Sequence, residues 1–233
     1  TACSQDTNKP QDTNKPVEPI NLYTDEYNGN KRVVSAKATE NAILTGNIDS
    51  SIPVFDSTKE TDAQVIVPVI VYDSLGNEYE IGIEFRKEAV TSGTTTWDWK
   101  VVGSKGLTAT TTGTTEISFN SDGKIVPPAG SSNVTATITL TPPDDSGSVP
   151  FDVTLDFTKM TMFASENSVK PLTVDGYPSG SLTSCSIGPD GMITGIYSNG
   201  KQKPLGLIGL AEFDNPAGLQ KVGDNMYIPS ANS

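Results

Sequence analysis

The sequence predicts a mainly β protein whose domains are of the sandwich or barrel kind. Short segments in which apolar and polar residues alternate recur along the chain, and Gly-Asn, Asp-Gly or Ser-Asn-Gly turns separate several of them. No segment shows the period of an amphipathic helix convincingly. The 233 residues suit one large or two modest domains and are long enough to bury real cores. Together these observations are typical of an all-β architecture.

The N-terminal residues 1–16 contain a tandem duplication, in which QDTNKP is followed directly by QDTNKP. Polar repeats punctuated by proline cannot bury a core, so we expect a linker or loop here. Cys3 lies in this polar tail, and a disulfide between it and Cys185 is therefore not expected. For Cys185 we expect the ordinary role of a small apolar residue inside a strand.

The densest strand signal lies in the middle of the chain. Residues 64–72 read QVIVPVIVY, and Pro68 predicts an edge strand or a bulge because proline cannot donate to a β ladder. A Gly-Asn turn over residues 73–77 leads into a return strand over residues 78–87 that alternates strictly. The predicted apolar face of this return strand consists of Tyr79, Ile81, Ile83 and Phe85.

Further strands are expected downstream at regular spacing. They cover residues 96–102, 116–120, 134–140 and 151–157, and an Asp-Gly turn follows the second of them.

The C-terminal part predicts a second β-hairpin. One apolar segment begins at Gly191, and a Ser-Asn-Gly turn over residues 198–200 leads to a second apolar segment over residues 205–214. An Asn-Pro-Ala-Gly-Leu sequence over residues 215–219 then predicts a defined exit corner.

The composition excludes several classes of function. The chain has no histidine, which removes the commonest general base, the usual zinc ligand and the Ser-His nucleophile arrangement. Its net charge of −12 argues against nucleic acid or an anionic membrane as a partner, since both require clustered Lys and Arg. No apolar run is long enough to cross a membrane.

The carboxylates favour turns and solvated faces over a chemical site. Asp122-Gly123, the Asp144–Gly147 segment and the Pro189–Gly191 segment lack the ligand spacing of an EF-hand. Asp152 and Asp156 share a face of an alternating strand, which is more typical of a solvent-exposed face than of paired catalytic carboxylates. We therefore expect no enzyme, no catalytic residue, no metal ion and no cofactor.

Three segments resemble the bacterial flagellar hook protein family. The C-terminal hairpin has the order G-x-I-x-G-x-Y-S-N-G followed by L-G-x-I-x-L-A-x-F-x-N-P-x-G-L. The middle hairpin carries V-x-V-Y-D-S-L-G-N, and residues 38–49 resemble the motif A-T-x-x-x-x-x-x-G-N-L-D. The resemblance implies structural roles for the motif residues Gly46, Asn47, Asp73, Gly76, Asn77, Gly195, Tyr197, Asn199, Gly200, Phe213, Asn215, Pro216, Gly218 and Leu219.

The same resemblance implies a domain order. After the linker at residues 1–16, residues 17–47 and 166–233 would form a discontinuous inner β domain. Residues 48–165 would form an outer β domain inserted within it, which requires the two ends of the insertion to lie close together. Hook proteins begin and end with long helical segments that have no counterpart here, so we expect a core fragment that is monomeric in isolation.

The function that the resemblance implies is a structural subunit of the flagellar hook, the flexible curved tube that transmits torque from rod to filament. Its partners would be other copies in a helical polymer and the rod, hook-cap and hook-filament junction proteins. Its location would be extracellular, after flagellar type III export. A bacterial surface adhesin or lipoprotein β-sandwich module is the alternative, because the chain is acidic, rich in β signals and begins Thr-Ala-Cys-Ser.

Overall fold

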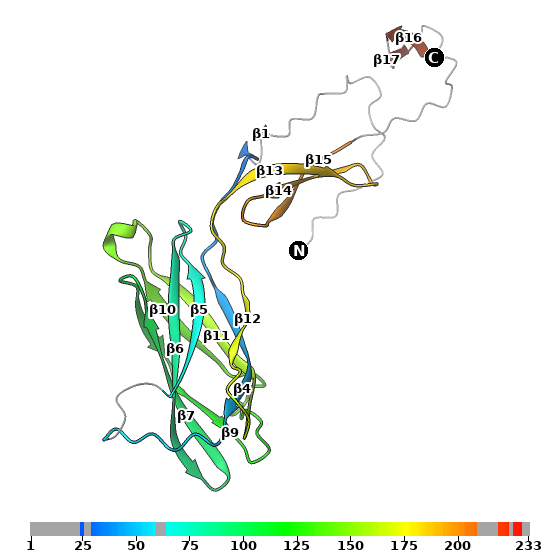
Figure 1. Ribbon diagram of the computed structural model, residues 1–233. Coiled ribbons are helices and arrows are strands. Elements are labelled where there is room, and N and C mark those ends of the chain that lie inside the picture. Colours follow the sequence, from blue (N-terminus) through cyan, green and yellow to red (C-terminus); the bar gives the residue numbers. More distant parts are fainter. Residues whose placement is uncertain (1–23, 26–28, 59–63, 209–218, 224–225, 230–233) are drawn as a thin grey trace. The chain divides into compact units, whose positions relative to one another are not determined.

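The computed structural model describes residues 24–25, 29–58, 64–208, 219–223 and 226–229 (Figure 1). Within these residues the protein is mainly β, as the sequence predicts, and the one helical element is the 3-10 turn η1 (Asp144–Ser146). None of the described residues belongs to a helix long and apolar enough to span a membrane.

The chain divides into two compact units. The larger unit comprises residues 33–182 and 197–201, and the smaller unit comprises residues 1–32, 183–196 and 202–233. These units follow contacts within a single chain, whereas the predicted inner and outer domains refer to places in a polymer. The predicted division after residues 47 and 165 therefore stays a prediction.

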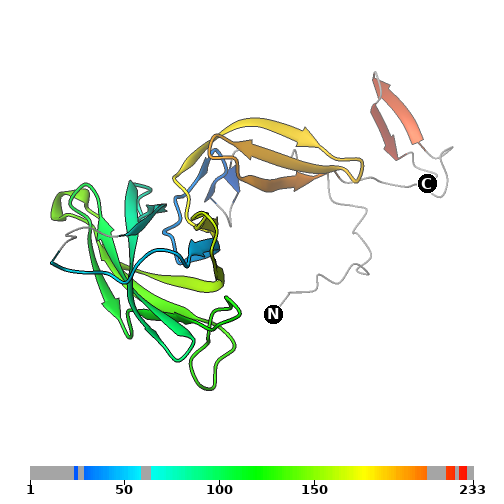
Figure 2. The ribbon, with the colours of Figure 1, turned by 60° about the horizontal axis from the view of Figure 1, so that its bottom comes forward.

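Two β-sheets build the larger unit, and they pack face to face (Figures 1 and 2). The first sheet has the strand order β12-β4-β11-β10-β8, and the second has the order β5-β6-β7-β9. Apolar residues of both sheets share one core, which confirms the expected sandwich-like architecture. The strands are β4 (Asn41–Asp49), β5 (Val65–Tyr72), β6 (Glu78–Thr91), β7 (Thr94–Gly103), β8 (Thr108–Thr112), β9 (Glu116–Phe119), β10 (Thr135–Thr141), β11 (Phe151–Phe163) and β12 (Lys170–Val174).

Strand β4 is the one that joins distant parts of the chain. It pairs parallel with β11 on one side and antiparallel with β12 on the other. All other strand pairs of the two sheets are antiparallel. Parallel neighbours need a long crossover connection, and here that connection contains the whole second sheet together with β8 and β10.

The predicted middle hairpin is present as β5 and β6. The four residues of its predicted apolar face are buried, with Ile81, Ile83 and Phe85 fully so. Strand β5 pairs only with β6, so Pro68 lies in an edge strand, as predicted.

Aromatic residues of both sheets meet at the centre of the core. The ring of Phe157 on β11 lies 6.1 Å from that of Phe85 on β6, edge to face, and 5.1 Å from that of Trp99 on β7. Large buried rings contribute much of a core's apolar area, and such ring pairs add to it. This contact therefore ties the second sheet to the first.

The smaller unit contains hairpins of short strands. Strand β14 (Met192–Tyr197) pairs antiparallel with β15 (Gln202–Leu207), which forms the predicted C-terminal hairpin with a return strand that starts before residue 205. The other strand pairs of this unit are β1 (Thr24–Asp25) with β2 (Gly29–Asn30) and β16 (Leu219–Gly223) with β17 (Met226–Pro229). Strand β13 (Gly180–Ile187) begins in the larger unit, where Gly180 and Ser181 pair with β3 (Val33–Val34). Cys185 lies within strand β13, as expected, and its thiol is free and exposed.

Replacement of Phe157 by alanine should lower the free energy of unfolding by about 3–5 kcal/mol, the usual cost of removing a buried aromatic ring. Denaturation by guanidinium, followed through the fluorescence of Trp97 and Trp99, measures this loss. Phe163→Ala is the matched control, because Phe163 lies on the same strand but is 51% exposed. Its cost should stay below about 1 kcal/mol, and equal losses for the two variants would contradict the assignment of the core.

Candidate functional site

The candidate site is structural and lies where the chain enters and leaves the sandwich. Residues 37–41 lead into β4 and run beside residues 175–178, which follow β12. Two backbone hydrogen bonds, from Lys37 N to Tyr177 O at 2.9 Å and from Tyr177 N to Lys37 O at 3.0 Å, hold the two segments together. Residues 72–77 contact both segments. These three segments form what we call the crossing site.

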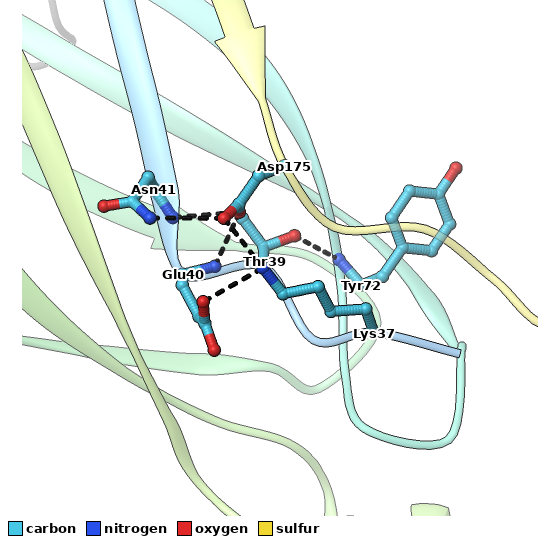
Figure 3. A network of polar contacts seen from close by, with 6 residues as sticks. All are labelled: Lys37, Thr39, Glu40, Asn41, Tyr72 and Asp175. Carbon is cyan, nitrogen blue, oxygen red and sulfur yellow. Dashed lines mark hydrogen bonds and ion pairs between the residues drawn. The ribbon is translucent and has the colours of Figure 1, made fainter. Parts of the chain in front are cut away.

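Asp175 is the main acceptor of the crossing site (Figure 3). Its Oδ1 accepts the backbone N–H groups of Glu40 at 2.8 Å and Asn41 at 3.0 Å, and its Oδ2 accepts the Asn41 side-chain amide at 3.2 Å. The Lys37 ammonium completes the set at 3.2 Å from Oδ2 and also lies 3.0 Å from the Glu40 carboxylate. One carboxylate thus fixes the first residues of β4 from a position 134 residues away.

These bonds lower the pKa of Asp175. Burial by itself raises its pKa, but the backbone N–H groups of Asn41 and Glu40, the Asn41 amide and Lys37 all favour the charged form and lower the pKa to about 2. Hydrogen bonds to Glu40 and Asp175 raise the pKa of Lys37 in return. The pair is therefore ionised at neutral pH.

Thr39 joins the same segment to strand β5. Its side chain is fully buried, its N–H donates to Tyr72 O at 2.9 Å, and its hydroxyl accepts the Tyr72 N–H at 3.0 Å (Figure 3). A side chain at Gly176 would collide with the Thr39 hydroxyl and backbone. The close approach of the two segments therefore needs glycine at residue 176.

The predicted motif residues Asp73, Gly76 and Asn77 form one turn. The buried Asp73 carboxylate accepts the N–H groups of Leu75 and Asn77, each at 2.9 Å, and the Asn77 side-chain amide at 2.8 Å. Burial raises the pKa of Asp73, but hydrogen bonds from Asn77, Leu75 and Tyr79 outweigh it and lower the pKa. Gly76 has a φ of +87°, which favours glycine.

The second predicted turn meets the first one at Pro178. The Asn199 amide donates to Pro178 O at 2.9 Å, and the Asn199 Oδ1 accepts the Lys201 N–H at 3.1 Å. Gly76 lies against Pro178 as well, because a Cβ atom there would be 3.2 Å from Pro178 Cα. The structure thus brings together two family motifs that are more than a hundred residues apart.

Other motif residues of this second hairpin have simpler places. Tyr197 is buried at the end of β14, Gly200 adopts a φ of +76° in the turn, and Gly195 lies within β14 opposite Lys203.

Gly46 and Asn47 make a separate set of contacts near the C-terminal end of β4. The Asn47 amide donates to Phe163 O at 3.2 Å and to Ser165 O at 3.1 Å, while its Oδ1 accepts the Phe163 N–H at 2.8 Å. The backbone of Asn47 also accepts the Ser168 N–H at 2.9 Å. Gly46 has a φ of +105°, and a Cβ atom there would collide with the Ser168 carbonyl. Asn47 therefore binds β4 to the chain between β11 and β12.

The predicted exit corner is only partly described. Phe213, Asn215, Pro216 and Gly218 lie outside the described residues, and Leu219 is the first residue of β16. Their structural roles stay a prediction.

Sequence reasoning missed Asp175, Thr39 and Lys87. Strict alternation places residue 87 on the apolar face of β6, so its odd position in the strand could have indicated that Lys87 is buried. Its ammonium donates to Ser50 O and Ile52 O, each at 2.8 Å, and burial lowers its pKa while the charge of Asp49 opposes the shift. Asp175 gave no comparable signal, because its partners lie at the other end of the unit's sequence.

The arrangement holds backbone segments together and offers no chemistry of its own. Within the part of the chain that the structure describes, no three or more Asp, Glu, Cys or His side chains are grouped so that they could hold a metal ion. The carboxylates of the crossing site are occupied by N–H donors and by Lys37.

Comparison with known proteins agrees with the motifs. Residues 28–177 match the family model described as "Flagellar basal body protein FlaE D2 domain". The flagellar hook protein FlgE of Escherichia coli K12 is 30% identical over 207 residues, which cover 86% of this chain and 49% of that protein. The corresponding protein of Salmonella typhimurium LT2 is 32% identical over 205 residues, covering 84% and 48%. The chain thus spans about half the length of the curated relatives it matches.

Among solved structures, the chain is similar to the crystal structure of the Helicobacter pylori flagellar hook protein FlgE2. The TM-score is 0.44 at 21% identity, and the match covers 70% of this chain and 36% of that one.

Replacement of Asp175 by asparagine should destabilise the protein by about 2 kcal/mol at pH 7. The folded pKa is about 2 against an ordinary value of 3.8, so the stabilisation is present above pH 3.8 and is lost as the pH falls through about 2. Urea denaturation between pH 7 and pH 2 should therefore show the difference from wild type shrinking only below about pH 4. The exposed Asp145→Asn is the control, and a pH-independent difference would contradict the role of the charge.

Replacement of Gly46 by alanine should cost about 3 kcal/mol or more, from backbone strain and from the collision with Ser168. Gly113 is a matched control, because its φ is +100° against +105° for Gly46 and a Cβ atom there would meet nothing within 4 Å. Gly113→Ala should cost only the strain of about 1–2 kcal/mol. Thermal denaturation of both variants gives the comparison, and equal losses would show that the approach to Ser168 is unimportant.

Proposed function

The chain belongs to the flagellar hook protein family, and we propose that it forms a torque-transmitting part of a hook subunit. The match of residues 28–177 to the family's D2 domain model carries this proposal. The family is structural and not enzymatic, and its members are located in the extracellular flagellar hook. No observation favours the alternative of an adhesin or lipoprotein module.

The proposed polymer is helical and built from copies of the same protein. Contacts between unlike faces of identical subunits repeat along an open filament when the rotation from one subunit to the next does not close a ring. We propose that the rod, hook-cap and hook-filament junction proteins are further partners, met at the ends of this polymer. The isolated chain is expected to be monomeric.

The crossing site suits a subunit that must carry load. Both chain segments that enter and leave the sandwich lie side by side, held by the Lys37–Tyr177 backbone bonds and by Asp175. A pull on one segment therefore reaches the other through short hydrogen bonds, without passing through the apolar core. An insertion of this kind also agrees with the proposal that an outer domain leaves an inner one and returns to it.

The surface suits contacts that break and form again as the tube bends. The chain carries a net charge of −12, and charge repulsion between copies keeps the attraction between them weak. The outward faces of β8 and β10 are rich in threonine, which makes polar contacts of modest strength. Weak polar contacts allow neighbouring subunits to slide while other parts keep the tube closed.

Two experiments on the full gene product test the proposal. Antibodies against this chain should label isolated hooks along their whole length and leave filaments unlabelled, as seen by immunogold electron microscopy. Absence of label on hooks would contradict the hook assignment.

The second experiment removes residues 38–176 and joins Lys37 to Tyr177 through a short Gly-Ser linker, since the two residues already form a β-bridge. Hooks should still assemble but with altered curvature and bending stiffness, because the removed sandwich no longer contacts its neighbours. Electron micrographs and swimming assays measure both properties. Insertion of the same linker at Gly113 without any deletion is the control. Hooks of unchanged curvature would contradict a mechanical role for this segment.

A further inference from the structure

The two sheets of the larger unit meet along the edges of β5 and β12. The two strands are neighbours in space (Figures 1 and 2), yet they belong to different sheets and pair only with β6 and with β4. Both strands lie wholly within the described residues, and no backbone hydrogen bond joins one to the other. We call these two facing edges the seam.

On β5, the hydrogen bonds of the turn that follows the strand show which backbone N–H and C=O groups point toward β6 and which point away from it. Asp73 N donates to Asn77 O, so the odd-numbered residues of this ladder exchange hydrogen bonds with β6. The N–H and C=O groups of Tyr72 instead point away from β6 and bond to Thr39. Ile66, Pro68 and Ile70 share this outward phase, because backbone direction repeats every two residues.

On β12, the same reasoning applies to Pro171. Ser168 N donates to Asn47 O, and the ladder continues with the pairs Lys170–Thr45 and Pro171–Leu44. Bonded and non-bonded pairs alternate in an antiparallel ladder, so residue 171 is in the non-bonded phase and its backbone nitrogen points away from β4. That direction is toward the seam. The bulge that follows at Leu172 interrupts the same edge once more.

Each edge of the seam therefore carries a proline at a position where any other residue would direct its backbone N–H into the seam. Proline has no N–H to give, and it is the residue by which natural sheets keep edge strands from pairing. We propose that Pro68 and Pro171 keep the seam free of backbone hydrogen bonds, so that side-chain packing alone holds the two sheets together along this edge. Val69 and Val71 of β5 and the partly buried Val174 of β12 belong to the apolar core that the two sheets share.

As a consequence, the two sheets can shift slightly relative to each other along the seam. Apolar attraction is non-directional, whereas a hydrogen bond weakens steeply when its geometry is distorted, so a bonded ladder resists sliding more than a packed edge does. Hydrogen bonds tie both ends of β5 to the segments that flank β4: Thr39 bonds to Tyr72 at one end, and the Gln64 side-chain amide donates to Pro53 O at 2.8 Å at the other. No backbone hydrogen bond crosses the seam between them. Only the use of this compliance in a bending hook rests on the proposed function. The chemistry of the seam does not.

Hydrogen exchange followed by NMR on the purified chain tests the proposal directly. In the wild type, the outward amides of Ile66 and Ile70 should exchange on the order of 100-fold faster than those of Val67 and Val69, which bond to β6. Equal protection at all four amides would overturn the proposal without the need for any variant.

The variant Pro68→Val/Pro171→Val restores both donors. The amides of residues 66, 68 and 70 should then exchange at least about tenfold more slowly than the wild-type amides of Ile66 and Ile70, and Tm should rise, as β5 and β12 form new bonds. Pro128→Val, at an exposed loop proline away from the seam, is the control and should leave both measurements unchanged. Unchanged exchange at the seam in the double variant would overturn the proposal.

Light scattering separates closure within one chain from pairing between chains. The double variant should remain monomeric. A dimer protected at the same amides would mean that the prolines exclude a second copy, and it would overturn closure of the seam as proposed.

Discussion

The structure depends on strand β4 being held between two strands that come from the far end of the sequence. β11 lies parallel to it and β12 antiparallel, so β4 is the strand that joins β12 to the rest of the first sheet. Asp175 fixes the beginning of β4 across 134 residues, and Asn47 fixes its end to Phe163 across 116 residues. Loop-closure entropy grows only with the logarithm of loop length, so closing a connection this long costs little more than closing one of half its length.

The same arrangement decides where the polar residues must be buried or half-buried. Asp175 and Asp73 lie where the backbone offers several N–H groups that no strand partner satisfies, and each carboxylate accepts more than one of them. Lys87 has the opposite task, since its ammonium donates to two free carbonyls of the segment that follows β4. A buried charge is tolerated at these places because its hydrogen bonds replace those lost from water. Charge-assisted bonds therefore fix the beginning of β4 through Asp175 and the segment that follows β4 through Lys87.

Much of the fold could be predicted from the alternation of apolar and polar residues, because this alternation and the turn residues indicate which neighbouring strands pair. The hairpin of β5 and β6, its buried face and the edge position of Pro68 all follow from alternation and from the chemistry of proline. The parallel pairing of β4 with β11 could not be predicted this way, since nothing near Asn41 encodes a partner at Thr154. The motif turns at Asp73 and Asn199 were recognised separately, but their meeting at Pro178 is a tertiary fact. Asp175 was missed for the same reason.

The two edges of β12 differ in how firmly they hold their neighbours. The edge toward β4 is hydrogen-bonded and resists relative motion, whereas the edge toward β5 is not. On one edge β12 is hydrogen-bonded to β4, so the two strands move as one body. On its other edge β12 faces β5 across a seam that lacks backbone bonds. Load that enters through residues 37–41 therefore passes into the first sheet, and the second sheet follows through apolar contacts, through Thr39 and through the bonds from Lys87 to the carbonyls of Ser50 and Ile52. Thr39 joins β5 to the start of β4 at the crossing site, and the Gln64 side-chain amide joins the other end of β5 to Pro53 O, so we expect relative motion of the sheets to be largest along the seam between these two points. A domain built this way can keep its two chain connections in fixed register while its distant surface adjusts to a neighbour, which is the combination that a bending tube of identical subunits requires.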